Sequence, residues 1–102
     1  LYFIARFMTS KILKPSNGPI CVTGANGFIG GHIVEQLLIS GYTVHATVRD
    51  PSNPKNRFLL EIAAKNDASD RLKLFRGDLQ VKGSFDNAFR GCTAVIHTAA
   101  SV

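Results

Sequence analysis

The stretch Thr-Gly-Ala-Asn-Gly-Phe-Ile-Gly at residues 23–30 decides the fold, because it separates two segments with different periodicities. Residues 20–23 form a short apolar run of the kind that makes a buried strand. From Ile29 onward, apolar residues recur every four positions, at Ile33 and Leu37, which is helical spacing. We therefore predict a strand, a glycine loop and a helix in direct succession.

Each glycine of this loop has its own role in a dinucleotide-binding turn. Gly24 allows the tight turn, Gly27 lets the backbone approach a pyrophosphate, and Gly30 lets the helix pack close to the strand. The helix N-terminus then faces the phosphates with its unpaired N–H groups. The spacing G-x-x-G-x-x-G alone is weak evidence, and a purely structural turn is the alternative. Its position between a strand and a helix favours nucleotide binding.

Strand-like and helix-like segments continue to alternate along the chain. Residues 42–48, 71–75 and 94–96 are typical of strands, whereas 58–63 and the segment that Ser84 can cap are typical of helices. This alternation predicts an α/β fold, a doubly wound and mostly parallel sheet with helices on both faces. We expect the strand order 3-2-1-4. We also expect the outer edge of the fourth strand to lack a neighbour.

The composition is that of one ordinary globular domain. The 102 residues include 12 Lys and Arg against 7 Asp and Glu, a net charge of +5, and 45% are hydrophobic. The excess charge lies at Arg6, Lys11 and Lys14, within residues 1–18, which we expect to be a flexible tail before a nucleotide-binding part at 19–102. The remaining basic residues are spread among acids, and no apolar run could span a membrane, so we expect neither nucleic-acid nor membrane binding.

The cysteines and the chain ends indicate the cellular context. Cys21 and Cys92 are too few and too far apart for a disulfide framework, and no Cys/His cluster has metal-ligand spacing. With no targeting signal evident, we expect reduced thiols, no metal and a cytoplasmic location. The chain opens at Leu1 and stops at Val102 just after a strand-like run, so we expect it to be the N-terminal part of a longer protein.

Charged residues follow the second strand, where this kind of fold recognises the adenosine ribose. Asp50 stands 20 residues after Gly30, a spacing that suits an acid on the ribose 2′-OH of NAD, but Pro51 places it in the following loop. Arg49 offers a planar guanidinium to the 2′-phosphate of NADP, and Lys55 and Arg57 add charge nearby. We predict NADP, with NAD as the alternative and a solvated turn as the simpler explanation.

Two further groups of residues follow the third and fourth strands. Asp78 is placed to accept a hydrogen bond from an adenine amino group, with Leu79 covering the ring; an acid that caps a loop is the alternative. Small residues that let the chain pass close beneath a cofactor end the fourth strand, namely Thr98, Ala99 and Ala100. We interpret His97 as a buried, hydrogen-bonded histidine rather than a catalytic one.

A further signal comes from four segments taken together, at 22–30, 41–51, 77–79 and 95–100. They resemble the extended short-chain dehydrogenase/reductases of the NAD-dependent epimerase/dehydratase superfamily, in particular the dihydroflavonol reductase and cinnamoyl-CoA reductase branch. The resemblance implies a Rossmann-type sheet, of which this chain carries the first βαβαβαβ portion. It also implies a pyrophosphate lining made of Gly24, Gly27, Phe28, Ile29 and Gly30.

The same resemblance assigns residues to the other parts of the cofactor. It implies that Arg49 holds the 2′-phosphate, Asp78 and Leu79 bracket the adenine, and residues 98–100 lie on the nicotinamide ribose side. The NAD-using epimerases carry their ribose acid seven residues after the glycine that matches Gly41, where this chain has Val48. One departure concerns the loop, where the branch often has a lysine pair but this chain has a single lysine at 55 followed by asparagine.

The resemblance implies an oxidoreductase that transfers hydride from NADPH to an aldehyde, ketone or acyl-CoA carbonyl of a small molecule. Family members use a Tyr-x-x-x-Lys pair, in which the tyrosine is the acid. This chain lacks the pair, since Tyr2 is followed four residues on by Arg6 and Tyr42 by Ala46. We therefore expect catalysis to need residues outside this chain. The alternatives are an NAD-dependent sugar-nucleotide epimerase/dehydratase, a 3β-hydroxysteroid dehydrogenase, or a nucleotide-sensing protein without chemistry.

Overall fold

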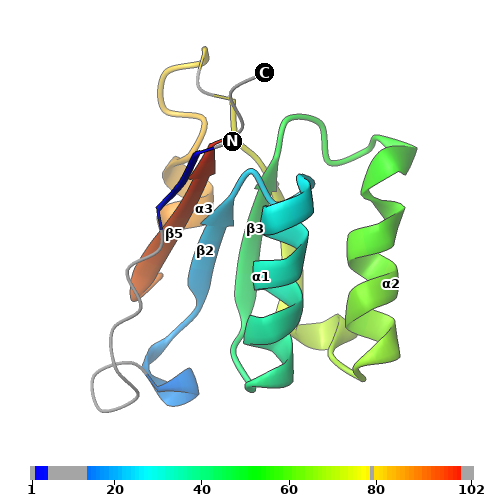
Figure 1. Cartoon of the computed structure of the whole chain (residues 1–102). Helices are drawn as coiled ribbons and strands as arrows, with labels where there is room; N and C mark the ends of the chain where they lie inside the picture. The colour runs from blue at the N-terminus through cyan, green and yellow to red at the C-terminus, as the bar shows by residue number, and fades with distance from the viewer. Residues whose placement is uncertain (1, 5–13, 79, 100–102) are drawn as a thin grey trace.

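The computed structural model describes residues 2–4, 14–78 and 80–99, which build a twisted five-stranded sheet (Figure 1). The strands are β1 (Tyr2–Ile4), β2 (Ile20–Thr23), β3 (Val44–Val48), β4 (Leu72–Arg76) and β5 (Ala94–Ala99). Their order in the sheet is β1-β5-β2-β3-β4, and β2 to β5 run parallel. The predicted α/β class and the order 3-2-1-4 are therefore confirmed.

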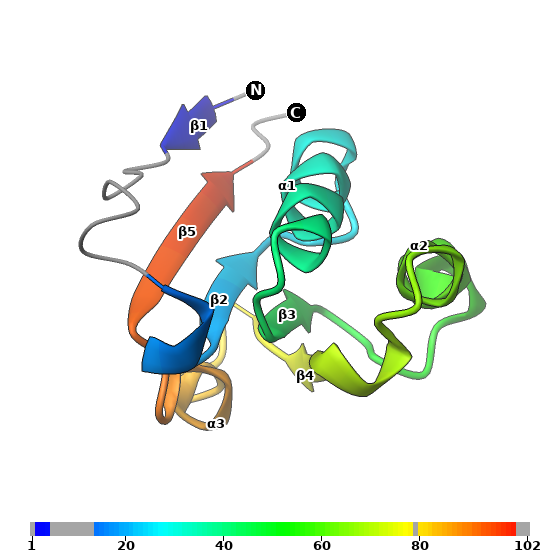
Figure 2. The ribbon, with the colours of Figure 1, turned by 90° about the horizontal axis from the view of Figure 1, so that it is seen from below.

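Helices cover both faces of the sheet. They are α1 (Phe28–Ile39), α2 (Arg57–Lys65) and α3 (Asp86–Phe89), with single 3₁₀ turns at Pro15–Asn17, Pro54–Asn56 and Ser69–Arg71. Figure 2 shows α1 and α2 on one face and α3 on the other. Within the described part of the chain, none of the helices combines the length and the apolar character needed to cross a membrane.

The core lies between the central strands and α1. Every residue of β2 and of β3 is buried, as expected for parallel strands that are covered on both faces. Val34 and Leu38 of α1 and Leu59 of α2 pack onto this layer with almost no exposed surface. Burying each such side chain stabilises the fold by ~1.5–3 kcal/mol, so the glycine loop, which joins β2 to α1, is attached to the buried core.

The outer edge of β5 is covered, which corrects the expectation that it lacks a neighbour. β1 pairs antiparallel with β5, and Tyr2, Phe3 and Ile4 lie opposite Ala99, Thr98 and His97. The strand itself, inside the segment 1–18, was not predicted. A three-residue strand is too short to show a periodicity, and its pairing depends on a partner more than ninety residues away.

The C-terminal end of α1 is tied to the start of β4. Gly41 adopts a positive φ of 94° after the helix, as a left-handed C-terminal glycine does. The Nη1 atom of Arg71 donates to the carbonyl oxygens of Leu38 and Tyr42 at 2.9 and 3.0 Å. A cation beside the carbonyl groups of a helix C-terminus is stabilising, so Arg71 connects two elements that the sequence alone did not link.

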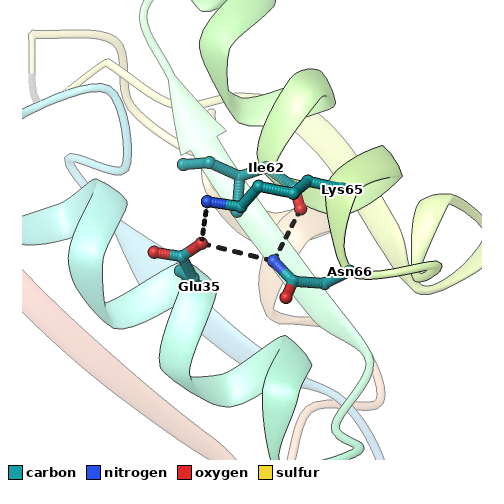
Figure 3. Close-up of polar contacts among 4 residues, drawn as sticks. All are labelled: Glu35, Ile62, Lys65 and Asn66. Atoms are coloured by element: carbon teal, nitrogen blue, oxygen red, sulfur yellow. Dashed lines mark hydrogen bonds and ion pairs between the residues drawn. The ribbon is translucent and has the colours of Figure 1, made fainter.

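A polar cluster joins α1 to the end of α2 (Figure 3). Lys65 Nζ lies 3.0 Å from Glu35 Oε2, and the Asn66 amide donates to the same oxygen at 3.3 Å and to the Ile62 carbonyl at 2.8 Å. The hydrogen bond from Lys65, then that from Asn66, lowers the pKa of the Glu35 carboxyl. The cluster orients α2 against α1 on the outer surface of the helical layer.

Candidate functional site

A groove of about 560 Å³ opens at the carboxyl ends of the parallel strands. Figure 1 shows the ends of β2, β3 and β5 together at the top of the sheet. The predicted site residues that line it are Gly24, Arg49, Lys55, Asp78 and Thr98. They come from the ends of all four parallel strands and the loops that follow, so the topology brings them together. Leu79 and Ala100 lie outside the described residues, and Ala99 is described only as part of the β5 backbone.

The turn after β2 depends on a close approach of β5. Gly24 has φ of +66°, and a Cβ added there would lie 2.6 Å from Thr98 Oγ1 and 2.7 Å from the Thr98 carbonyl oxygen. The Thr98 hydroxyl donates to the Thr23 carbonyl at 2.6 Å. Gly24 therefore meets two requirements, a left-handed backbone and contact with a neighbouring strand.

The other two glycines of the loop have different surroundings. A Cβ on Gly27 would meet only the Gly24 carbonyl oxygen, at 3.4 Å, so this position is open. A Cβ on Gly30 would overlap that same oxygen and lie 2.9 Å from the Ala25 Cα atom. Gly30 thus packs against the loop itself, whereas the sequence analysis assigned it to contact with the strand.

The first turn of α1 follows directly and contains the remaining predicted pyrophosphate residues. Gly27 is the N-cap without a side-chain hydrogen bond, and the turn holds no acidic residue. Phe28 and Ile29 contribute backbone N–H groups there, of the kind that can hold an anion. The Phe28 side chain is 79% exposed and packs edge-on against the His32 ring, at 4.8 Å between centroids.

Asp50, the acid considered for the adenosine ribose, is engaged within its own loop. Asp50 Oδ1 accepts hydrogen bonds from the Ser52 hydroxyl at 2.7 Å and from the Ser52 backbone N–H at 3.1 Å. These bonds, with a smaller contribution from the charge of Arg76, lower the pKa of Asp50. Arg49 and Lys55 line the groove beside it with exposed side chains, whereas Arg57, at the start of α2, is exposed but does not line the groove. Two cations and an internally bonded carboxylate therefore face this end of the groove.

Asn56, which follows Lys55, supports this loop from its buried side. The sequence analysis missed that role. Its side chain is 3% exposed, and its amide Nδ2 donates to the Asp50 carbonyl at 2.7 Å. Its Oδ1 atom is buried without a hydrogen-bond partner. Burial of an asparagine next to a proline-rich loop leaves no periodic signal, so only the fold shows it.

The loop after β4 is fastened by Ser84, which was expected to cap a helix. The Ser84 hydroxyl accepts from the Asp78 N–H at 2.9 Å and donates to the Asp78 carbonyl at 2.8 Å, and α3 starts later, at Asp86 with Phe85 as its N-cap. Asp78 Oδ1 accepts from the Gln80 N–H at 2.9 Å. The second carboxylate oxygen of Asp78 can accept from a ligand, and Phe85 lines the groove beside it.

His97 lies where β5 reaches the groove. Its Nδ1 atom is 2.6 Å from the Thr23 hydroxyl oxygen, so the expected hydrogen-bond partner is present. The expected burial is wrong, because His97 lies where β5 meets the groove and is only half-buried. The thiols contribute no nucleophile to the groove. Burial, with a contribution from the neighbouring Cys92, raises the pKa of Cys21 to about 12. Within the described residues, no group of three His, Cys, Asp or Glu side chains is placed to hold a metal.

Comparison with known sequences gives a consistent result. Residues 20–102 match the NAD dependent epimerase/dehydratase family. Tetraketide alpha-pyrone reductase 1 from Arabidopsis thaliana is 47% identical over 90 residues, which cover 88% of this chain and 27% of that protein. Dihydroflavonol 4-reductase from Hordeum vulgare is 49% identical over 85 residues, covering 82% of this chain and 23% of that protein. The chain thus spans about a quarter of the length of these curated relatives.

Solved structures agree in fold and sequence. Vestitone reductase from alfalfa superposes with a TM-score of 0.68 at 38% identity, covering 83% of this chain and 26% of that one. Yeast methylglyoxal/isovaleraldehyde reductase complexed with NADPH superposes with a TM-score of 0.65 at 31% identity, covering 81% of this chain and 24% of that one.

Proposed function

The chain belongs to the NAD dependent epimerase/dehydratase family, and on this basis we propose that it forms the NADP-binding part of an oxidoreductase. The reaction is hydride transfer from NADPH to an aldehyde, ketone or acyl-CoA carbonyl of a small molecule, in the cytoplasm. Support comes from the names of its relatives, which are reductases, and from a solved relative complexed with NADPH.

One observation carries the preference for NADP over NAD. Arg49 and Lys55 line the ribose end of the groove, while Asp50 Oδ1 is bonded to Ser52. A guanidinium can donate two parallel hydrogen bonds to a phosphate, and a nearby ammonium adds charge. Asp50 Oδ1 is occupied by two hydrogen bonds from Ser52, and its carboxylate would repel a phosphate less than the two neighbouring cations attract it. The balance of donors therefore favours a 2′-phosphate at this end.

We assign residues of this chain to each part of the dinucleotide. We assign the pyrophosphate to the backbone N–H groups of residues 27–30, the adenine to Asp78 and Leu79, and the nicotinamide ribose side to residues 98–100. When bound, the nicotinamide supplies the hydride. The 102 residues contain no Tyr-x-x-x-Lys pair, so the protonation of the substrate oxygen is assigned to residues outside this chain, and binding rather than turnover is the property to test.

The test is a titration of the chain with NADPH and, separately, with NADH, followed by nucleotide fluorescence. We expect NADPH to bind more tightly. Arg49→Ala removes a charge-assisted contact worth ~1.5–3 kcal/mol, so NADPH affinity should fall by about 10- to 100-fold while NADH affinity hardly changes. Lys55→Ala should give a smaller loss, because an ammonium acts as a point charge.

A matched control is Arg57→Ala, because Arg57 is exposed, carries the same charge close by, and is not among the residues that line the groove. It should leave both affinities unchanged. Equal binding of the two nucleotides, or a preference for NADH, would contradict the proposal. That outcome would favour an NAD-using epimerase/dehydratase or a 3β-hydroxysteroid dehydrogenase.

A further inference from the structure

We propose that the ring of Phe85 forms a wall of the adenine subsite and contacts the base directly. The inference rests on the proposed function, because it adds a residue to the same cofactor site. Phe85 reaches the groove from the segment before α3, and it is not among the residues that the sequence predicted for the site.

The ring is packed onto the end of β4. A Cβ added at Gly77 would lie 2.6 Å from Phe85 Cε1 and 2.9 Å from Phe85 Cδ1. The same hypothetical atom would lie 2.9 Å from Thr47 Cβ. Phe85 therefore fills the space above Gly77, at the carboxyl ends of β3 and β4, one residue before Asp78. The absence of a side chain at Gly77 is what lets the ring reach the groove.

Two contacts hold the ring in place. The reciprocal hydrogen bonds between Ser84 and Asp78 fasten the segment before Phe85 to the segment after β4. On the other side, Phe85 stacks with Phe89, at 5.6 Å between centroids and 25° between planes. A ring that is already ordered loses little freedom when a ligand binds against it.

The neighbours of the ring match the chemistry of adenine. Among the described residues that line the groove, Phe85 is the only phenyl side chain, and Asp78 beside it carries a carboxylate acceptor. Adenine presents an apolar π-face and an exocyclic amino donor, so the two side chains together offer both complements. Arg49, at the next strand end, lies where a phosphate on the attached ribose would be bound.

The experiment separates the two halves of the cofactor. The probes are adenosine 2′,5′-bisphosphate, which carries the adenine, and reduced nicotinamide mononucleotide, which does not. Stacking on an aromatic side chain contributes enough that Phe85→Leu should weaken binding of the bisphosphate by about tenfold. The mononucleotide, titrated by its own fluorescence, should bind to Phe85→Leu as it does to the unaltered chain.

Phe89→Leu is the matched control. Phe89 stacks on Phe85 but is not among the groove-lining residues, and 41% of its side chain is exposed. This variant removes the stacking on Phe85 but leaves the Phe85 ring in the groove, so it should weaken bisphosphate binding clearly less than Phe85→Leu does. If it reproduces the loss of Phe85→Leu, or if Phe85→Leu weakens both probes equally, Phe85 acts through the packing of α3 and the inference is wrong.

A second measurement does not depend on the variant folding. In the unaltered chain, nuclear Overhauser effects between the adenine protons of the bound bisphosphate and the Phe85 ring protons are expected, and their absence would overturn the inference. An unaltered chain that binds neither NADPH nor the bisphosphate would instead contradict the proposed function. Binding of both with no Phe85 contact would contradict this inference alone.

Discussion

Gly30→Ala and Gly31→Ala change two neighbouring buried positions of α1. The surroundings differ, because Gly30 faces backbone atoms and Gly31 faces a side chain. At Gly30 the new methyl group would overlap the Gly24 carbonyl oxygen and lie 2.9–3.0 Å from other backbone atoms of the loop. At Gly31 it would lie 3.0 Å from Cε2 of Phe58, a side-chain atom. Phe58 borders a shallow pocket of about 210 Å³, so its ring has space into which it can shift.

The expected free energies follow from these contacts. Alanine in place of glycine favours a helix by up to ~1 kcal/mol at either position. At Gly30, overpacking costs ~1–3 kcal/mol, and disturbing the hydrogen bond from the Gly27 N–H to the Gly24 carbonyl, 3.1 Å long, costs ~1 kcal/mol more. We expect Gly30→Ala to lower the free energy of unfolding by ~2 kcal/mol, and Gly31→Ala to be close to neutral.

Urea unfolding followed by circular dichroism measures this difference, and thermal unfolding should show a melting temperature lower by roughly 10 °C for Gly30→Ala. NADPH titration of the same variants adds a functional readout, since the displaced carbonyl belongs to the loop proposed to hold the pyrophosphate. Equal losses at the two positions, or a larger loss for Gly31→Ala, would show that the close contact with the loop is not what requires glycine at residue 30.

Three further outcomes are expected. The pKa of Asp50 is lower in the folded chain than in the unfolded chain. The stability that its carboxylate contributes is therefore present above the unfolded pKa and is lost as the pH falls through the folded pKa. Ser52→Ala should raise the folded pKa in a carbon-13 NMR titration, and an unchanged pKa would contradict the role of Ser52. Cys21, buried and with its pKa raised to about 12, should resist a thiol reagent at pH 8 until urea unfolds the chain; rapid labelling of the folded chain would contradict this. Arg71→Met should lower the free energy of unfolding by ~1–2 kcal/mol, because it removes two charge-assisted hydrogen bonds at the end of α1. Arg57→Met, at an exposed site, should change that free energy by less than ~0.5 kcal/mol; equal effects would contradict the helix-end role.

The sequence was sufficient for the parallel part of the fold because the signals there are local. The change from an apolar strand to helical spacing across residues 23–30 places β2, the loop and α1 without any tertiary information. Strand ends followed by Arg49, Asp78 and Thr98 then meet in one groove, since parallel strands end at the same edge of a sheet.

The features that could not be predicted depend on partners far along the chain or on burial without a pattern. Ser84 looks like a helix cap from its forward neighbours, but its hydroxyl bonds backward to Asp78. Asn56 is buried because its amide reaches the Asp50 carbonyl. Phe85 fits an amphipathic pattern, and only the folded β4 shows that its ring stands over Gly77.

The contact between Gly24 and Thr98 also bears on the order in which the chain folds. The turn proposed to hold the phosphates is encoded near the beginning, yet its shape rests on a strand 75 residues further along. Contacts of such long sequence separation form slowly, because a large loop must close first. Synthesis proceeds from the N-terminus, so β2 and α1 are made before β5. The contact of Thr98 with the turn can form only after β5 has been made. We expect nucleotide binding to arise late, in one step with the docking of β5. The nucleotide would then bind and stabilise only those chains in which the sheet is complete.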